Sequence, residues 1–297
     1  MGTHIRIPVL LDVLIVSDAE EILACAADPR LKRGPLLHGP LLNKVINGFA
    51  QSTLHAPVGP LPSALPREDP ARAKAQKALA ARLAAPAPWD DESLDLIADW
   101  MGGRKTPLDL ACQQAIGRLF VPDFTAKPAT WHAAMVLHRS LNSRNPALRV
   151  LWQITGETKR AQKVLADAMD GDTSGVHAVG IAVHTFQRAV ERMESVLADP
   201  ALRATVSDAA ALGHAMSAPD TVLRHTECYA TTAAGHVAPG TIVLLQLDPA
   251  THRLADPRIA FLSETWSACP AAQLVPRMLA EIWARATGQR PAARHAA

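Results

Sequence analysis

Apolar positions recur along most of the chain with the three- to four-residue spacing that is typical of amphipathic helices. Residues 6–16 and 241–247 break this pattern, because both are continuous runs rich in β-branched residues and leucine, which predicts strands. Helices are predicted over residues 19–27, 71–83, 90–101, 108–120, 130–141, 150–169 with a break near Gly156, 176–197, 201–216 and 271–287. The pattern therefore predicts a mainly α-helical fold with a small β region.

One long stretch lacks any periodicity. Residues 33–68 contain many prolines and glycines, and they are expected to form a loop that carries a short helix over residues 42–49. A loop of this length inside a compact domain is usually functional. No internal repeat or linker-like block divides the chain, so we expect one domain over residues 1–287 and a disordered tail over residues 288–297.

Composition excludes several classes of protein. The 297 residues carry a formal net charge of +2 with basic and acidic residues interleaved, and only 4% of them are aromatic, which argues against a nucleic-acid surface. The apolar run before residue 17 is interrupted by Asp12 and is too short to cross a bilayer, so no membrane association is expected. The cysteines form no Cys-x-x-Cys pair, which argues against a zinc site or a disulfide framework. We expect a cytoplasmic protein with reduced cysteines.

The stretch with the clearest chemistry is Trp266-Ser-Ala-Cys269-Pro-Ala-Ala-Gln-Leu274. Cys269 directly precedes a predicted helix, whose free N–H groups and positive dipole end favour a thiolate. Such a thiolate is a metal ligand or a nucleophile. The alternative is that Cys269 is a small buried apolar side chain, which is the commoner role of an isolated cysteine.

Segments along most of the chain occur in the order found in one known family. The segments are residues 15–21, 27–31, 68–77, 171–173, 197–202, 224, 237–241, 256–261 and 268–274. In this order they resemble the early strand and B helix, the C helix, the I-helix turn, the end of the following helix, the sheet region and the cysteine loop of the cytochrome P450 superfamily. The collinearity of the segments makes the resemblance specific, although each segment is short.

The resemblance implies a haem-thiolate protein that holds haem b (iron protoporphyrin IX). It makes Cys269 the metal ligand and places Arg224 on a haem propionate. Arg72 stands near the family's C-helix histidine, and Lys77 replaces its arginine. Ser267 occupies the position of the propionate ligand two residues before the cysteine. For Arg72 and Lys77 the alternative is a solvated helix face.

The resemblance also assigns Asp172 and Thr173 to the acid–alcohol pair that carries protons to iron-bound oxygen. An N-cap is the alternative, because either residue precedes the apolar helix that begins near Val176, and both roles are compatible. His177 and His184 lie seven residues apart, on one face of a regular helix. They are expected either to line the pocket or to occupy solvent or core positions.

Two family motifs are absent. The stretch equivalent to the K helix, residues 209–218, contains no Glu-x-x-Arg, and the pattern formed by Glu157 and Arg160 lies before the I-helix segment. The Phe-Gly-x-Gly-x-His/Arg pattern is replaced by Phe261-Leu-Ser-Glu-Thr-Trp-Ser-Ala, which has no glycine. The loop before the cysteine is also shorter than usual. The chain is therefore interpreted as a reduced and divergent member.

Taken together, these observations predict a haem-dependent oxidoreductase, a monooxygenase or a peroxide-using relative, that acts on a small apolar substrate. Any electron donor is expected to be a separate protein, because no flavin or iron–sulfur module is recognisable. The changes concentrate on the cysteine side, where an electron donor docks, and this favours peroxide over dioxygen. The alternatives are a non-catalytic haem protein that serves as sensor, carrier or partner subunit, and a haem-free relic.

Overall fold

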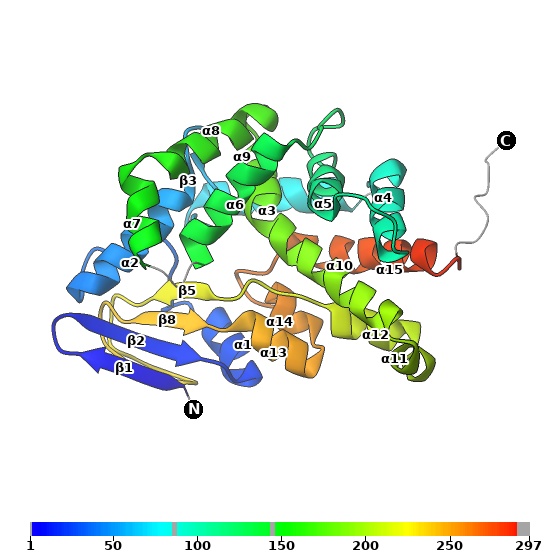
Figure 1. Ribbon diagram of the computed structural model, residues 1–297. Helices are drawn as coiled ribbons and strands as arrows, with labels where there is room; N and C mark the ends of the chain where they lie inside the picture. The colour runs from blue at the N-terminus through cyan, green and yellow to red at the C-terminus, as the bar shows by residue number, and fades with distance from the viewer. Residues whose placement is uncertain (1, 85–87, 143–145, 290–297) are drawn as a thin grey trace.

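The computed structural model describes residues 2–84, 88–142 and 146–289, and helices dominate it (Figure 1). The helices are α1 Ala19–Ala27, α2 Leu41–Thr53, α3 Pro70–Leu83, α4 Asp91–Met101, α5 Leu108–Gly117, α6 Pro128–Asn142, α7 Pro146–Ile154, α8 Glu157–Ala168, α9 Thr173–His177, α10 Val183–Ala198, α11 Pro200–Thr205, α12 Asp208–Ala215, α13 Leu247–Leu254, α14 Pro257–Phe261 and α15 Leu274–Ala286. The prediction of a mainly α-helical fold with a small β region is confirmed.

Eight strands form the β region of the described residues. They are β1 Thr3–Ile7, β2 Leu11–Val16, β3 His55–Ala56, β4 Gly59–Pro60, β5 Val222–His225, β6 Ala230–Thr232, β7 Gly235–Val237 and β8 Ile242–Leu245. The largest sheet has the order β1-β2-β8-β5, with β2 and β8 parallel and the other neighbours antiparallel. Strand β5 is an edge strand that pairs Arg224 with Val243, so it fixes Arg224 beside the helical layer (Figure 1).

The two layers have separate apolar cores. Buried side chains of α4, α5, α10 and α15, which pack against one another, form the helical core around Met193, Leu279 and Trp283. The sheet packs its other apolar cluster against α1, α13 and α14, around Ile22 and Ile259. Arg224 lies on the edge strand of the sheet, and Cys269 lies in the segment that joins α14, on the sheet side, to α15 in the helical layer.

The longest predicted helix, residues 176–197, is interrupted. Helix α9 and α10 are joined by a π turn over Ala178–Ala182, which adds a residue to one turn of the helix. Asp172 caps the amino end by accepting hydrogen bonds from the backbone N–H groups of Ser174 at 2.8 Å and Gly175 at 3.2 Å. The capping interpretation of Asp172 is therefore confirmed.

Other boundaries differ from the prediction for local reasons. The predicted helix 201–216 is two helices, because Ser207 caps a new helix at Asp208. The short helix predicted over residues 42–49 extends to the full length of α2. The expected break near Gly156 is present, with φ at 73°. No helix in the described parts of the chain is long and apolar enough to cross a membrane. Of the predicted tail, residues 290–297 lie outside the described residues.

Candidate functional site

Cys269 is the N-cap of a single 3₁₀ turn, Pro270–Ala272, which leads into α15. Its own N–H donates to the carbonyl of Phe261 at 2.8 Å, which fixes the loop across the turn. The residue is exposed, yet burial raises the pKa of the thiol, while the Ala271 N–H and the charge of Arg33 lower it.

The loop before Cys269 keeps an unusual backbone. Leu262 and Glu264 have φ angles of 47° and 66°, in the left-handed region that favours glycine. They stand one and three residues after Phe261, where the pattern Phe-Gly-x-Gly has its glycines. These two positions therefore adopt the left-handed conformation although neither is glycine, the residue that adopts it most easily. A non-glycine residue held in this region stores about 1–2 kcal/mol of strain.

Three arginines from distant parts of the sequence surround the ring of Trp266. The guanidinium carbon lies 5.6 Å from the ring centroid for Arg33, 4.9 Å for Arg72 and 5.2 Å for Arg224. Arg33 belongs to the loop before α2, Arg72 to the first turn of α3, and Arg224 to β5. Cation–π contact compensates part of the mutual repulsion of the three charges. We call Arg33, Arg72, Arg224 and Trp266 the arginine cluster.

The arginine cluster has no internal counter-charge. Within the described residues, no carboxylate lies in ion-pair distance of Arg33, Arg72 or Arg224. Arg224 is fully buried and donates to the hydroxyl of Ser267 at 2.8 Å, and Arg72 donates to the carbonyl of Leu65 at 3.0 Å. The Nε atoms of Arg72 and Arg224 have no hydrogen-bond partner, and the same holds for the indole nitrogen of Trp266.

The pKa values of all three guanidinium groups are shifted downward. Burial and then the charge of Arg72 lower the pKa of Arg33 to about 9. Burial followed by the charges of Arg33 and Arg72 holds the pKa of Arg224 well below its ordinary value, and burial alone lowers that of Arg72. Because a guanidinium group keeps its charge in proteins, the cluster presents partly and fully buried positive charge that an anion would neutralise.

The structure brings together four of the residues selected from the sequence. Arg72, Arg224, Ser267 and Cys269 belong to or adjoin the arginine cluster, as described above. Lys77 does not join them, because its side chain is exposed on α3. The solvated-face alternative thus describes Lys77 and not Arg72, which is 5% exposed.

Asp172 and Thr173 lie at the start of α9 instead of inside a continuous helix. Besides capping α9, the Asp172 carboxylate pairs with Arg82 at 2.7 Å, and Thr173 is the first residue of the helix. On α9, His177 is the residue on which the charge of the arginine cluster acts. Burial and then the charge of Arg33 lower the pKa of His177 to about 4. The proton-transfer role of Asp172 and Thr173 stays a prediction.

His177 and His184 meet different surroundings, although they are seven residues apart. His184 lies against the rings of Trp131 at 4.8 Å and His138 at 4.3 Å, with no charge of the arginine cluster among the causes of its pKa shift. The π turn between the two histidines rotates one relative to the other. An expectation based on a regular helix therefore does not describe this segment.

Sequence reasoning missed Arg33 and Trp266. Arg33 lies in the aperiodic loop, where no pattern distinguishes a buried arginine from an exposed one. Trp266 was noted only as a neighbour of Cys269, although a tryptophan three residues before a candidate ligand is a usable signal, since aromatic faces attract arginine.

These residues fit a flat cofactor that carries two carboxylates and a thiolate-binding metal. Guanidinium groups bind carboxylates in paired hydrogen bonds, and the unpartnered Nε atoms of Arg72 and Arg224 are suitable donors. An accessible thiol is close enough to the cluster that the charge of Arg33 acts on it. Iron protoporphyrin IX combines both features, whereas a free phosphate or carboxylate metabolite would leave the thiol unused.

No known family model matches the chain, and no curated protein sequence is significantly similar to it. Solved structures are similar. P450BioI, bound to an acyl carrier protein that carries hexadec-9Z-enoic acid, aligns with a TM-score of 0.60 at 13% identity over 96% of this chain and 86% of its own.

Two further structures give the same result. MoxA from Nonomuraea recticatena has a TM-score of 0.56 at 13% identity over 100% of this chain and 86% of its own. P450EXα with myristic acid has a TM-score of 0.60 at 9% identity over 95% and 82%. All three are cytochromes P450, so the chain has the cytochrome P450 fold in a shortened form, as the resemblance in sequence predicted.

Proposed function

We propose that the chain is a haem-thiolate protein in which Cys269 would supply the thiolate ligand of haem b. The observation that carries the proposal is the meeting of an accessible cysteine thiol with buried arginines that have no carboxylate partner among the described residues. Haem bound through a thiolate supplies electron density that favours cleavage of an O–O bond.

The residues of the chain have separate tasks in this site. Arg72 and Arg224 would bind the propionates through their unpartnered Nε–H groups, and the indole N–H of Trp266 would be a further donor. Ser267 orients the Arg224 guanidinium through its hydroxyl. Cys269 would hold the iron as a thiolate, and the Ala271 N–H and the charge of Arg33 favour that deprotonated form because both lower the pKa of the thiol.

The direct test is haem titration of the purified protein, followed by a ferrous-CO spectrum, with the Cys269→Ser variant beside it. The parent should bind one haem and show the red-shifted band of a thiolate ligand, and Cys269→Ser should lose that band. Cys228→Ser is the matched control, because Cys228 is also an exposed free cysteine but lies outside the cluster. Unchanged spectra in Cys269→Ser contradict the assignment of the ligand, and the absence of haem binding in the parent contradicts the whole proposal.

The proposed reaction is oxidation of a small apolar substrate, driven by a peroxide more efficiently than by dioxygen with a separate electron donor. Two structural neighbours contain fatty acyl or fatty acid ligands, which supports a substrate of apolar character. Hydrogen peroxide should give haem-dependent product, and Thr173→Ala should change its yield. Brisk turnover with a reductase and none with peroxide would establish ordinary monooxygenase chemistry instead.

A non-catalytic haem protein is the second candidate. The observation that favours it is the engagement of Asp172, the acid of the expected proton path, in the cap of α9 and in the pair with Arg82. A carboxylate held in both ways is poorly placed to shuttle protons. Haem binding without turnover by peroxide or by a reductase would support this candidate as a sensor, carrier or partner subunit.

A further inference from the structure

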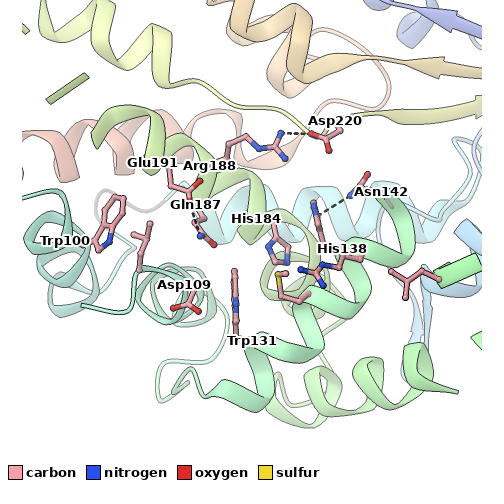
Figure 2. A pocket seen from close by; sticks show the side chains of 14 residues that line it. Trp100, Asp109, Trp131, His138, Asn142, His184, Gln187, Arg188, Glu191 and Asp220 are labelled. Carbon is pink, nitrogen blue, oxygen red and sulfur yellow. Dashed lines mark hydrogen bonds and ion pairs between the residues drawn. The ribbon is translucent and has the colours of Figure 1, made fainter. Parts of the chain in front are cut away.

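A recess lies along α10, and it shares no residue with the arginine cluster (Figure 2). Its volume is about 840 Å³, and its walls come from α4, α5, α6, α7, α10 and the loop that carries Asp220. Neither Cys269 nor any residue of the arginine cluster lines it. Recesses of this volume hold small molecules when a few polar groups converge in them. We call this recess the α10 pocket.

One end of the α10 pocket combines aromatic rings and acids. Trp100 and Trp131 lie on either side of Asp109, and Glu191 faces them from α10 (Figure 2). Both carboxylates act on the pKa of Cys112, which places them in the same part of the molecule. Neither has an ion-pair partner among the described residues. Aromatic faces and carboxylates both attract cations.

The inner wall adds a third acceptor, His184, which is 9% exposed. Its Nε2 atom has no hydrogen-bond partner, and in a neutral imidazole with its proton on Nδ1 the lone pair of Nε2 is a hydrogen-bond acceptor. Burial and then the neighbouring His138 lower the pKa of His184 to about 4, so the lone pair persists at neutral pH.

The positive charges of the α10 pocket do not cancel this pattern. Arg188 is paired with Asp220 at 2.6 Å and with Asp248 at 3.0 Å. Arg139 is exposed to solvent, and its charge contributes to lowering the pKa values of His138 and His184. At the aromatic end, Glu191 accepts one hydrogen bond from the Gln187 amide at 2.8 Å and Asp109 accepts one from the Leu110 N–H at 2.9 Å, so each carboxylate keeps a second oxygen for a ligand.

We propose that the α10 pocket binds a small organic cation, a primary ammonium or amidinium with an apolar body. The cationic head lies between Trp100 and Trp131 and donates to the carboxylates of Asp109 and Glu191. The apolar body extends along Trp131 toward His184, whose Nε2 accepts a hydrogen bond from a ligand N–H or O–H group. The site is independent of haem, because it uses no residue of the arginine cluster.

The test compares three ligands of similar shape: 2-phenylethylammonium, the neutral 2-phenylethanol and the anionic 3-phenylpropanoate. Binding is measured by calorimetry and by protein NMR shifts at low salt, on protein with and without added haem. The cation should bind at least about ten-fold more tightly than the alcohol, and the carboxylate should bind weakest. Equal or inverted order overturns the proposal, as does the absence of binding of all three ligands at about 10 mM.

Variants locate the site. Asp109→Asn combined with Glu191→Gln should reduce the preference for the cation over the alcohol to less than about three-fold, without unfolding the protein. Glu194→Gln is the matched control, because Glu194 lies on the same helix but does not line the α10 pocket. If Glu194→Gln changes the preference as much as the double variant does, the cation binds elsewhere and the proposal is wrong.

Discussion

Two groups of partly or fully buried arginines differ in what surrounds them. Arg188 and Arg192 on α10 share the carboxylate of Asp248, at 3.0 and 2.8 Å, and Arg188 also pairs with Asp220. The arginine cluster around Trp266 has no such acid among the described residues. The pKa values reflect this difference: that of Arg188 is raised, although its burial opposes the rise, while that of Arg224 is held far below its ordinary value.

The two groups of arginines therefore differ in what they contribute to the stability of the protein. The Asp248 carboxylate also accepts from the Ser217 hydroxyl and the Ala218 N–H, both at 3.1 Å, so it ties α10 to the loop before β5 and to the start of α13. Its pairs are complete within the protein, and they hold the fold together. The arginine cluster costs stability in the protein alone, because buried charge without a partner is unfavourable. Such a cost is retained where a ligand compensates it.

The largest expected effect is that of Asp248→Asn. It leaves two partly buried arginines without their shared carboxylate, so the free energy of unfolding should fall by about 2–4 kcal/mol. Urea denaturation of the protein without haem measures this effect. Asp167→Asn is the control, because the exposed i,i+4 pair of Asp167 with Lys163 should contribute less than about 0.5 kcal/mol. Equal effects of the two variants would show that the Asp248 network does not hold the fold.

Arg224→Met should have effects of opposite sign on stability and on haem binding. Removing a buried charge without a partner should raise the free energy of unfolding of the haem-free protein by about 1–2 kcal/mol. Haem affinity should fall about ten-fold or more, because a charge-assisted propionate contact is lost. Denaturation and haem titration of the same preparation measure both quantities.

Arg188→Met is the matched variant for Arg224→Met. It removes an arginine that has partners, so it should destabilise the protein and leave haem affinity within about two-fold of the parent. If both variants destabilise the haem-free protein equally, the two groups of arginines do not differ in function. If Arg224→Met leaves haem affinity unchanged, the propionate assignment is wrong.

The same contrast explains how far the sequence could predict the molecule. Capping residues and apolar spacing are local, so helix α1 and the cap at Asp172 followed from them. The position of β5 at the edge of the sheet, where Arg224 is buried, depends on its pairing with β8, so only the family resemblance pointed to Arg224. Whether a given arginine meets an acid is decided by contacts between distant segments. Arg33 was therefore missed.

The π turn is a second case in which local rules failed. The apolar pattern of Ala178-Val-Gly-Ile-Ala182 does not reveal the π turn, which lies against α5 and α6. It decides that His177 lies in the field of Arg33 while His184 lines the α10 pocket. A single added residue in one turn thus separates two sites that a regular helix would have merged.

The smallest expected effect concerns the backbone beside the arginine cluster. Glu264→Gly should raise the free energy of unfolding by about 0.5–1 kcal/mol, because glycine relieves about 1–2 kcal/mol of left-handed strain and gives back about 0.5–1 kcal/mol in unfolded-state entropy. Glu264 is exposed, so no packing is lost. Leu262→Gly would not give this result, since Leu262 is 4% exposed and its side chain is part of the sheet-side core.

Ser263→Gly is the control for Glu264→Gly. Ser263 lies between the two left-handed residues but does not share their positive φ, so glycine there should lower stability by about 0.5–1 kcal/mol. Thermal and urea denaturation of the two variants measure effects of opposite sign. Two losses of equal size would mean that the loop carries no relievable strain. A gain from Glu264→Gly together with unchanged haem affinity would show that the shape of the loop, and not its side chain at this position, is what the cysteine site requires.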